Sequence, residues 1–269
     1  MLVRNIECRK AALDWLCESD ASIKAAGVLA LGRMVTDKNP HLIIDTKIAL
    51  TPDAIIPGRP LRPKLVNPLE LPKRSMRTMD GRAALIHALA HIEFNAINLA
   101  LDAIWRFADM PENYYYDWLK VAAEEAYHFS LLNAHLHTLG FEYGSFTGHN
   151  SLWEMVDRTK DDVLARMALV PRTMEARGLD ASPQLHNKFV QIGDIEMGEI
   201  LTIILRDEIG HVAIGNIWFN WLCKQRNLEP INTFEVLRNQ YAAPKLRPPF
   251  NMEARRLAGF SEAELALLN

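Results

Sequence analysis

Two segments of this sequence place a Glu and a His three residues apart inside otherwise apolar helical stretches. They are Glu125 with His128 in VAAEEAYHFSLL, and Glu208 with His211 in TIILRDEIGHVAIG. Residues three apart on a helix are separated by about 60° around the axis and about 4.5 Å along it, so each pair projects from one face. Because the flanking positions are apolar, both helices are predicted to be buried, with their polar pairs facing the interior.

The spacing of two further carboxylates relates them to these pairs. Glu93 lies 32 residues before Glu125, and Glu175 lies 33 residues before Glu208. In an antiparallel hairpin, two residues at the same height are equally far from the turn. The midpoints of both intervals fall beside predicted turns, the ADMPEN break over 108–113 and the turn at Gly193. We therefore predict a four-helix bundle in which four Glu and two His lie at one level.

The rest of the sequence also has a helical pattern. Apolar positions recur at the helical period, and Ser, Asp, Gly and Pro residues mark the expected helix ends. The sequence contains no Gly-rich phosphate loop and no useful run of alternating strand pattern. The predicted fold class is therefore all-α, with long helices over 81–108, 113–139, 151–177 and 195–225, one or two short helices within 6–34, a short piece from Ser182 and a final helix from Ser261.

Prolines set the expected organisation outside the bundle. Seven of them lie between Asn39 and Lys73. Because proline lacks a backbone N–H and fixes φ, this stretch is predicted to be an extended arm rather than a domain. The predicted division is an N-terminal part with short helices and the proline-rich arm over 1–80, the four-helix bundle over 81–226, and a C-terminal extension over 227–269.

Composition excludes several classes of function. The 33 acidic and 30 basic residues give a net charge of -3, which provides no general attraction for nucleic acid or an anionic membrane. Cys8, Cys17 and Cys223 lack metal-ligand spacing, so neither a thiolate zinc site nor a disulfide framework is expected. The N-terminus has no signal-peptide core, and no stretch reaches the roughly 18 apolar residues of a membrane span. We expect a cytoplasmic protein with no membrane partner.

The ligand pattern has a known counterpart. Ferritin-like di-iron and di-manganese carboxylate proteins take one Glu from each of two helices and a Glu-x-x-His pair from each of the other two. Residues 81–226 resemble that superfamily, and the MEARG and RDEIGH segments resemble a poorly characterised bacterial branch, distantly similar to the ferritin-like tRNA hydroxylases. The resemblance implies that the metal ligands are Glu93, Glu125, His128, Glu175, Glu208 and His211. It also implies that Glu124 and Asp207 each hydrogen-bond to a ligand His and fix its tautomer.

A dinuclear centre of this kind implies a function. Carboxylates and imidazole favour Fe or Mn over soft thiophilic metals, and four carboxylates offset most of the charge of two divalent cations. The expected cofactor is a pair of Fe ions, with Mn or a mixed Mn/Fe pair as alternatives. The resemblance implies an oxidoreductase that activates O2 to hydroxylate or oxidise an unidentified organic substrate, either a small molecule or RNA. It would use a separate electron donor, and a homodimer is one option for its assembly.

Two other functions fit the same residues. A ferroxidase or iron-handling protein would use Fe(II) itself as substrate, and a non-catalytic metal-binding or scaffold protein would keep the residues without the chemistry. Geometry assigns nearby candidates to structural roles. His87 and His91 lie about 120° and 160° around their helix from Glu93, so neither is expected to be a ligand. Tyr127 points about 100° away from its neighbour His128, which favours core packing. Gly178 and Pro183 predict an interruption just beyond Glu175, so the third long helix is expected to end or bend there.

Overall fold

The computed structural model describes residues 5–72 and 74–268 and forms two compact units. The first unit is Met1–Ser151 and the second is Leu152–Asn269. Lys73, the last residue of the predicted arm, lies outside the described residues, as do residues 1–4 and 269. The described part of the chain is mostly helical, as the sequence predicts. The predicted boundaries after residues 80 and 226 stay predictions.

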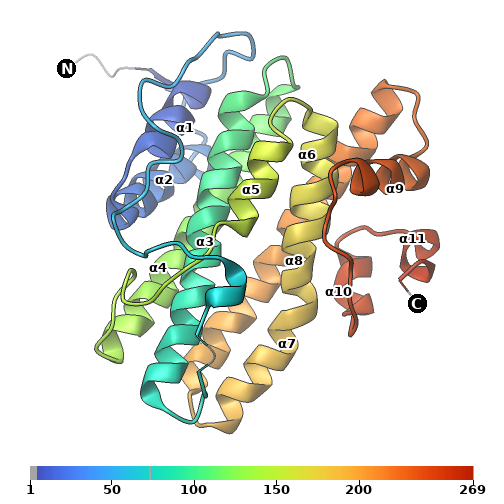
Figure 1. Cartoon of the computed structure of the whole chain (residues 1–269). Helices are drawn as coiled ribbons and strands as arrows, with labels where there is room; N and C mark the ends of the chain where they lie inside the picture. The colour runs from blue at the N-terminus through green and yellow to red at the C-terminus, as the bar shows by residue number, and fades with distance from the viewer. Residues whose placement is uncertain (1–4, 73, 269) are drawn as a thin grey trace. The chain divides into compact units, whose positions relative to one another are not determined.

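Two long helices form the centre of the first unit. In this unit α3 packs along α4, α2 packs against α4, and α1 packs against α3 (Figure 1). Two short parallel strands pair Ile6 with Leu42 and Glu7 with Ile43. The bounds are β1 Ile6–Glu7, α1 Cys8–Cys17, α2 Ala21–Thr36, β2 Leu42–Ile43, η1 Pro68–Glu70, α3 Met79–Arg106 and α4 Glu112–Thr138.

Local signals explain why α3 and α4 begin and end where they do. The Thr78 hydroxyl caps the start of α3 by accepting from the N–H of Gly81 at 3.1 Å. Just after α4, Gly140 adopts a φ of 82°, a left-handed conformation that stops the helix. The predicted helices over 81–108 and 113–139 are therefore confirmed, with their ends shifted by at most two residues.

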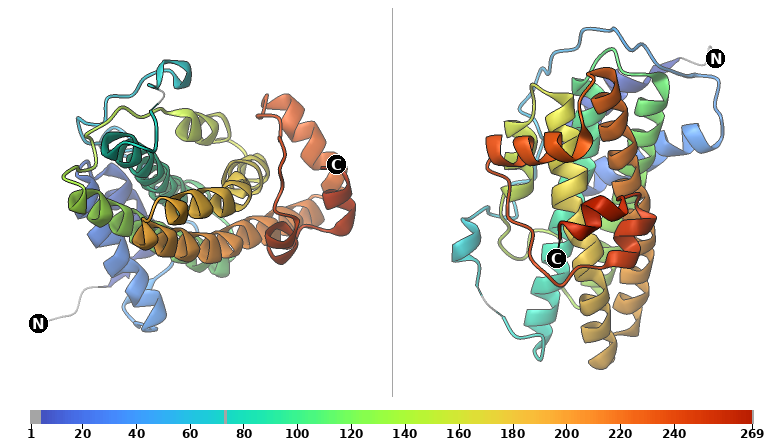
Figure 2. Two further views of the ribbon diagram at one scale, coloured as in Figure 1. Left: turned by 90° about the horizontal axis from the view of Figure 1, so that it is seen from below. Right: turned by 90° about the vertical axis from the view of Figure 1, so that its right-hand side faces the viewer.

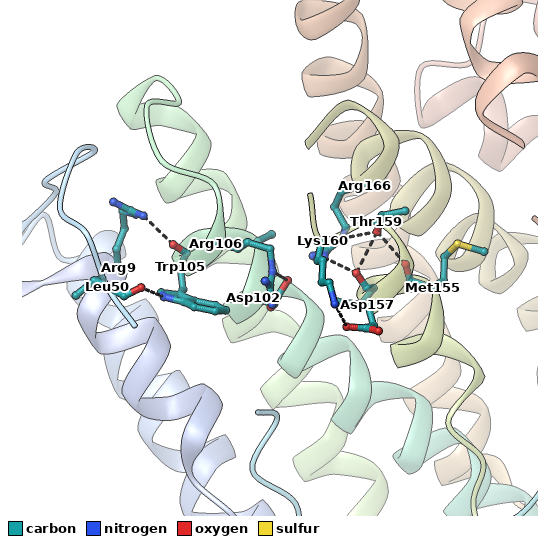
Figure 3. A network of polar contacts seen from close by, with 12 residues as sticks. Arg9, Leu50, Asp102, Trp105, Arg106, Met155, Asp157, Thr159, Lys160 and Arg166 are labelled. Atoms are coloured by element: carbon teal, nitrogen blue, oxygen red, sulfur yellow. Dashed lines mark hydrogen bonds and ion pairs between the residues drawn. The ribbon is translucent and has the colours of Figure 1, made fainter. Parts of the chain in front are cut away.

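The proline-rich arm is held in place by a buried arginine. Arg9, on α1, donates to the carbonyls of Ile104 and Trp105 at the end of α3. It also donates to three carbonyls of the arm, those of Asp45, Thr46 and Ile48. Figure 3 shows the Arg9 bond to Trp105, and beside it the Trp105 indole donating to the carbonyl of Leu50. The described part of the arm has mostly irregular backbone apart from β2 and η1, and one side chain supplies hydrogen bonds that this backbone lacks.

Replacing Arg9 by Ala is expected to destabilise the protein by roughly 3 kcal/mol, because five backbone carbonyls lose a charged donor. The measurement is the free energy of unfolding in urea. Lys10→Ala is the matched control, since Lys10 is exposed and pairs with exposed Asp14, and it should cost less than about 1 kcal/mol. Equal losses in the two variants would contradict the role assigned to Arg9.

The second unit is built around the α7 and α8 hairpin. Gly193, with a φ of 84°, forms the turn, and the Asp194 side chain caps α8 through the N–H of Met197. The predicted helix over 195–225 is confirmed at both ends. The bounds are α5 Ser151–Arg158, α6 Val163–Leu169, π-helix η2 Val170–Glu175, α7 Ala176–Gln191, α8 Ile195–Gln225, α9 Pro230–Gln240, α10 Met252–Leu257 and α11 Glu262–Ala266.

The prediction for the third long helix is wrong in two respects. The stretch 151–177 is broken after α5, where Arg166 donates to the Thr159 hydroxyl at 2.8 Å (Figure 3), and it contains the π-helix η2. In addition, α7 continues through Gly178 and Pro183 to Gln191 instead of stopping. Pro183 lacks the N–H that would bond to the carbonyl of Leu179, and Asn251 donates to that carbonyl at 3.2 Å instead. A residue far along the chain therefore satisfies the acceptor that the proline leaves open.

The C-terminal extension packs onto this hairpin. Figure 2 shows α10 lying against α7 and α8, and a buried cluster there combines Ala176 and Val212 of the hairpin with Ala254, Phe260 and Leu265 of the extension. The predicted final helix is present as α11, with the capping box at Ser261.

One helix among the described residues, α3, is long and apolar enough to cross a membrane by length and composition. Within its most apolar window, 72% of the residues are buried inside the protein. A core helix of a soluble protein has the same properties, and the burial of α3 is consistent with that interpretation.

Candidate metal centre

Three of the predicted ligands meet inside the first unit. Glu93 comes from α3, and Glu125 and His128 come from α4; all three side chains are buried. The Nδ1 atom of His128 lies 3.5 Å from a carboxylate oxygen of Glu93 and 3.5 Å from one of Glu125. Each residue offers a ligand atom, and these atoms lie within 4.8 Å of one another. The antiparallel packing of α3 and α4 thus brings Glu93 level with Glu125, as the spacing of 32 residues predicts.

The electrostatics of this cluster favour a bound cation. Burial and the nearby charge of Glu125 raise the pKa of Glu93 to about 8, because an ionised carboxylate is poorly solvated there and is repelled by its neighbour. The His128 imidazole opposes this shift through its contact with Glu93. A cation between the two carboxylates would remove both penalties, and carboxylate oxygen with imidazole nitrogen is a donor set that suits Fe, Mn or Zn. The residues present therefore fit a metal ion.

The second unit carries the other three predicted ligands. Glu208 and His211 lie on α8, with His211 Nδ1 3.9 Å from a carboxylate oxygen of Glu208, and both are buried. Glu175 is also buried and is the last residue of η2, which packs against α8. The Glu-x-x-His pattern therefore produces the same buried acid and imidazole pair in each unit. The assignment of all six residues to metal ligation stays a prediction.

The π-helix η2, which ends at Glu175, was not predicted from the sequence. Within it the Thr173 hydroxyl donates to the carbonyl of Ala168 at 2.9 Å, five residues earlier. Pro171, the second residue of this π-helix, has no N–H, and its ring packs on Gly215 of α8. A single π turn inside a helix is often found at a functional site, since it shifts the direction of the following side chain. The only signal in the sequence was Pro171 within an otherwise helical pattern.

Gly215→Ala is expected to destabilise the protein by roughly 2 kcal/mol, because an ideal Cβ at this position would lie 2.4 Å from the Cβ of Pro171. Metal content should fall as well if Glu175 is a ligand, since the clash displaces the turn that carries it. Thermal unfolding and metal analysis measure the two effects. The control is Gly178→Ala in α7, where a Cβ would meet nothing within 4 Å. A Gly215→Ala protein with the stability of wild type would refute the prediction.

The acids next to the two pairs have other contacts in the structure. Glu124 accepts from Lys120 at 3.0 Å, and Asp207 pairs with Arg206 at 2.8 Å. Glu124 is partly exposed, whereas the Asp207 side chain is only 10% exposed. Their predicted hydrogen bonds to ligand His residues stay predictions.

Most neighbouring candidates have structural roles, as predicted. Buried His87 accepts from the N–H of Gly144 at 3.0 Å, and His91 contacts the Tyr143 hydroxyl at 2.8 Å. Burial lowers the pKa of both imidazoles to about 4, so they are neutral at physiological pH. The prediction for Tyr127 is wrong: its side chain is 41% exposed rather than packed in the core. Its neighbours on the buried face of α4 already fill that space, and Tyr127 falls on the opposite side of the helix.

The fold and the cluster define a class of protein: a helical protein whose buried Glu and His residues can bind a metal ion. Residues 17–266 match the family described as "Protein of unknown function (DUF455)". Because the match covers nearly the whole sequence, the chain belongs to that family.

A relative from Haemophilus influenzae supports the same assignment. This protein, described as "Uncharacterized protein", is 45% identical over 260 residues, which cover 91% of this chain and 90% of the relative. No solved structure matches the chain.

Proposed function

We propose that this protein is a dinuclear iron oxidoreductase with a ferritin-like bundle, which uses O2 to hydroxylate or oxidise an organic substrate. The observation that carries the proposal is the buried cluster of Glu93, Glu125 and His128, a donor set that fits a metal ion. The second Glu-x-x-His pair, Glu208 with His211, supplies the same chemistry again. With Glu175 these residues make four carboxylates and two imidazoles, the ligand set of di-iron carboxylate proteins.

Each group has a defined task in this proposal. Glu93 and Glu125 would hold one ion together with His128, while Glu175, Glu208 and His211 would hold the other. When bound, the two Fe ions would supply the electrons and the Lewis acidity needed to activate O2. Because Glu93 has a pKa of about 8 without metal, it must release its proton as the ion binds. The buried setting of the ligands excludes bulk water from the site.

The proposal extends to partners and location. The organic substrate is a small molecule or an RNA, and a separate protein supplies electrons. We place the protein in the cytoplasm and consider a homodimer the simplest assembly. The alternatives are a ferroxidase, which would turn over Fe(II) without an organic substrate, and a metal-binding or scaffold protein without turnover.

Metal analysis of protein from iron-replete cells tests the proposal most directly. We expect about two Fe per chain, and a near-ultraviolet absorption change when anaerobically loaded Fe(II) protein meets O2. Mössbauer spectra of the loaded protein distinguish one spin-coupled pair from two separate ions, because only a pair with shared ligands shows coupling. Protein that never holds more than a trace of metal would refute the function, and uncoupled ions would refute the dinuclear centre.

Product analysis separates the alternatives. Repeated oxidation of added Fe(II), with release of Fe(III) and no need for an organic compound, would indicate a ferroxidase. A loaded centre that consumes O2 once and then stops without a reductant is the behaviour expected of the proposed oxidoreductase.

A further inference from the structure

A cavity of about 300 Å³ lies in the second unit, bounded by the C-terminal extension. Its walls come from α9, the segment 244–250, α10 and α11, together with Arg172 of η2. The volume is at the lower end of the range for small-molecule sites. None of the six predicted metal ligands lines it. The cavity is therefore a separate feature of the molecule.

The side chain of Arg172 is the most unusual component of this cavity. It is 1% exposed, and its guanidinium pairs with Glu264 of α11 through Nη2. Its Nε and Nη1 atoms have no hydrogen-bond partner among the described residues. A buried guanidinium with unsatisfied N–H groups is costly, since these donors have lost water without gaining an acceptor. Ligand oxygen atoms in the cavity would satisfy them.

Aromatic rings hold this guanidinium in place. Its Cζ atom lies 4.1 Å from the ring centroid of Phe219, 4.8 Å from that of Phe234 and 5.3 Å from that of Phe260. Ring faces stabilise the cation but accept no conventional hydrogen bond, so they leave its donors available. Phe234 and Phe260 also line the cavity, together with Phe250 and Leu246. The walls therefore combine a positive group with an apolar surface.

The other charged groups of the cavity leave it with a cationic excess. Arg172, Arg238, Lys245 and Arg255 line it against two acids, Glu235 and Glu264. Arg255 is neutralised by Asp180, with contacts of 2.6 and 3.0 Å, and Arg238 pairs with Glu235 at 2.9 Å. Arg238 nevertheless has a buried Nε atom without a hydrogen-bond partner among the described residues. Lys245 is exposed and adds a further positive charge.

We propose that this cavity is a binding site for a small amphipathic oxyanion, a carboxylate or phosphate group carried on an apolar body. The oxyanion accepts from the open donors of Arg172 and Arg238 and is attracted by Lys245, while the apolar body packs on the Phe and Leu side chains. A neutral apolar molecule would leave the guanidinium donors unsatisfied, and an inorganic anion would leave the aromatic walls uncovered. None of the predicted metal ligands lines the site, so binding can be measured on both chelator-treated and metal-loaded protein.

Calorimetric titration of the full chain with four probes tests the proposal. Octanoate and octyl phosphate combine an apolar chain with a negative charge. Octanamide has the chain without the charge, and inorganic phosphate has the charge without the chain. We expect at least one of the two organic anions to bind with a Kd below about 1 mM, and octanamide and inorganic phosphate to bind at least about tenfold more weakly. Comparing octanoate with octyl phosphate shows whether a carboxylate or a phosphate is preferred.

Matched variants locate the binding. Lys245→Gln is expected to weaken binding of the organic anion about tenfold, because an attractive charge is removed. Arg247→Gln is the control, since Arg247 is also exposed, lies two residues away and does not line this cavity. Arg238→Gln gives a second test that avoids the fully buried Arg172. The proposal would be overturned if neither organic anion bound, or if octanamide or inorganic phosphate bound as tightly as the organic anions. Equal effects of Lys245→Gln and Arg247→Gln would also overturn it.

Discussion

Glu125→Gln is expected to weaken metal binding more than about 100-fold, so that the purified variant contains only a trace of iron. Glu125 is fully buried and contacts His128, and its carboxylate lies beside that of Glu93. The amide of Gln keeps the shape of the side chain but removes the negative charge and one strong ligand atom. Changes to groups that only orient a ligand already cost 10- to roughly 100-fold in affinity, so loss of a ligand should cost more.

Each half of the predicted centre has a matched control for this experiment. Glu112 lies on the same helix as Glu125 but is exposed, so the Glu112→Gln variant should retain the iron content of wild type. Glu208→Gln is compared with Glu199→Gln, since Glu199 lies on α8 and is also exposed. Iron content by mass spectrometry and Fe(II) affinity by competition are the measurements. If Glu125→Gln kept wild-type iron while folding normally, this carboxylate would not be a ligand.

Glu93→Gln should change how the stability of the metal-free protein depends on pH. Burial and the charge of Glu125 raise the pKa of Glu93 to about 8 from an ordinary value of 4.5. Between these values the folded chain holds a proton that the unfolded chain has released. Stability therefore falls as pH rises through this window, by roughly 1 kcal/mol per pH unit for one proton. The Gln variant has no such proton, so this part of the decline should disappear.

Urea unfolding with a chelator between pH 6.5 and roughly pH 8.5 measures this difference. His87 and His91 are neutral in the folded state throughout this window, because burial lowers their pKa values to about 4. In the unfolded chain they titrate at about pH 6.5, at the lower edge of the window, and this contribution is the same in wild type and in Glu93→Gln. Glu199→Gln is the control, since its exposed side chain should leave the wild-type slope unchanged. Identical slopes in wild type and Glu93→Gln would show that Glu93 is not held protonated.

Local sequence information was enough to predict the helices that carry most of the candidate site. The ends of α3, α4 and α8 follow from caps, glycines and helical periodicity, which act within a few residues. The approach of Glu93 to Glu125 also follows, since a short turn fixes the register of two neighbouring antiparallel helices. The third helix could not be predicted in the same way. Its π turn depends on how Pro171 packs on Gly215, a contact between segments far apart in sequence.

The sequence by itself determined an all-α protein with two buried Glu-x-x-His pairs, because both properties depend on periodicity within single helices. Only the tertiary structure decided that α7 passes through Pro183 and that Arg172 is buried among aromatic rings. Asn251 satisfies the carbonyl left open by the proline, and the C-terminal extension supplies Glu264 and Phe260 around Arg172. The physical reason is that the cost of an unsatisfied backbone group or a buried charge depends on which distant residues reach it.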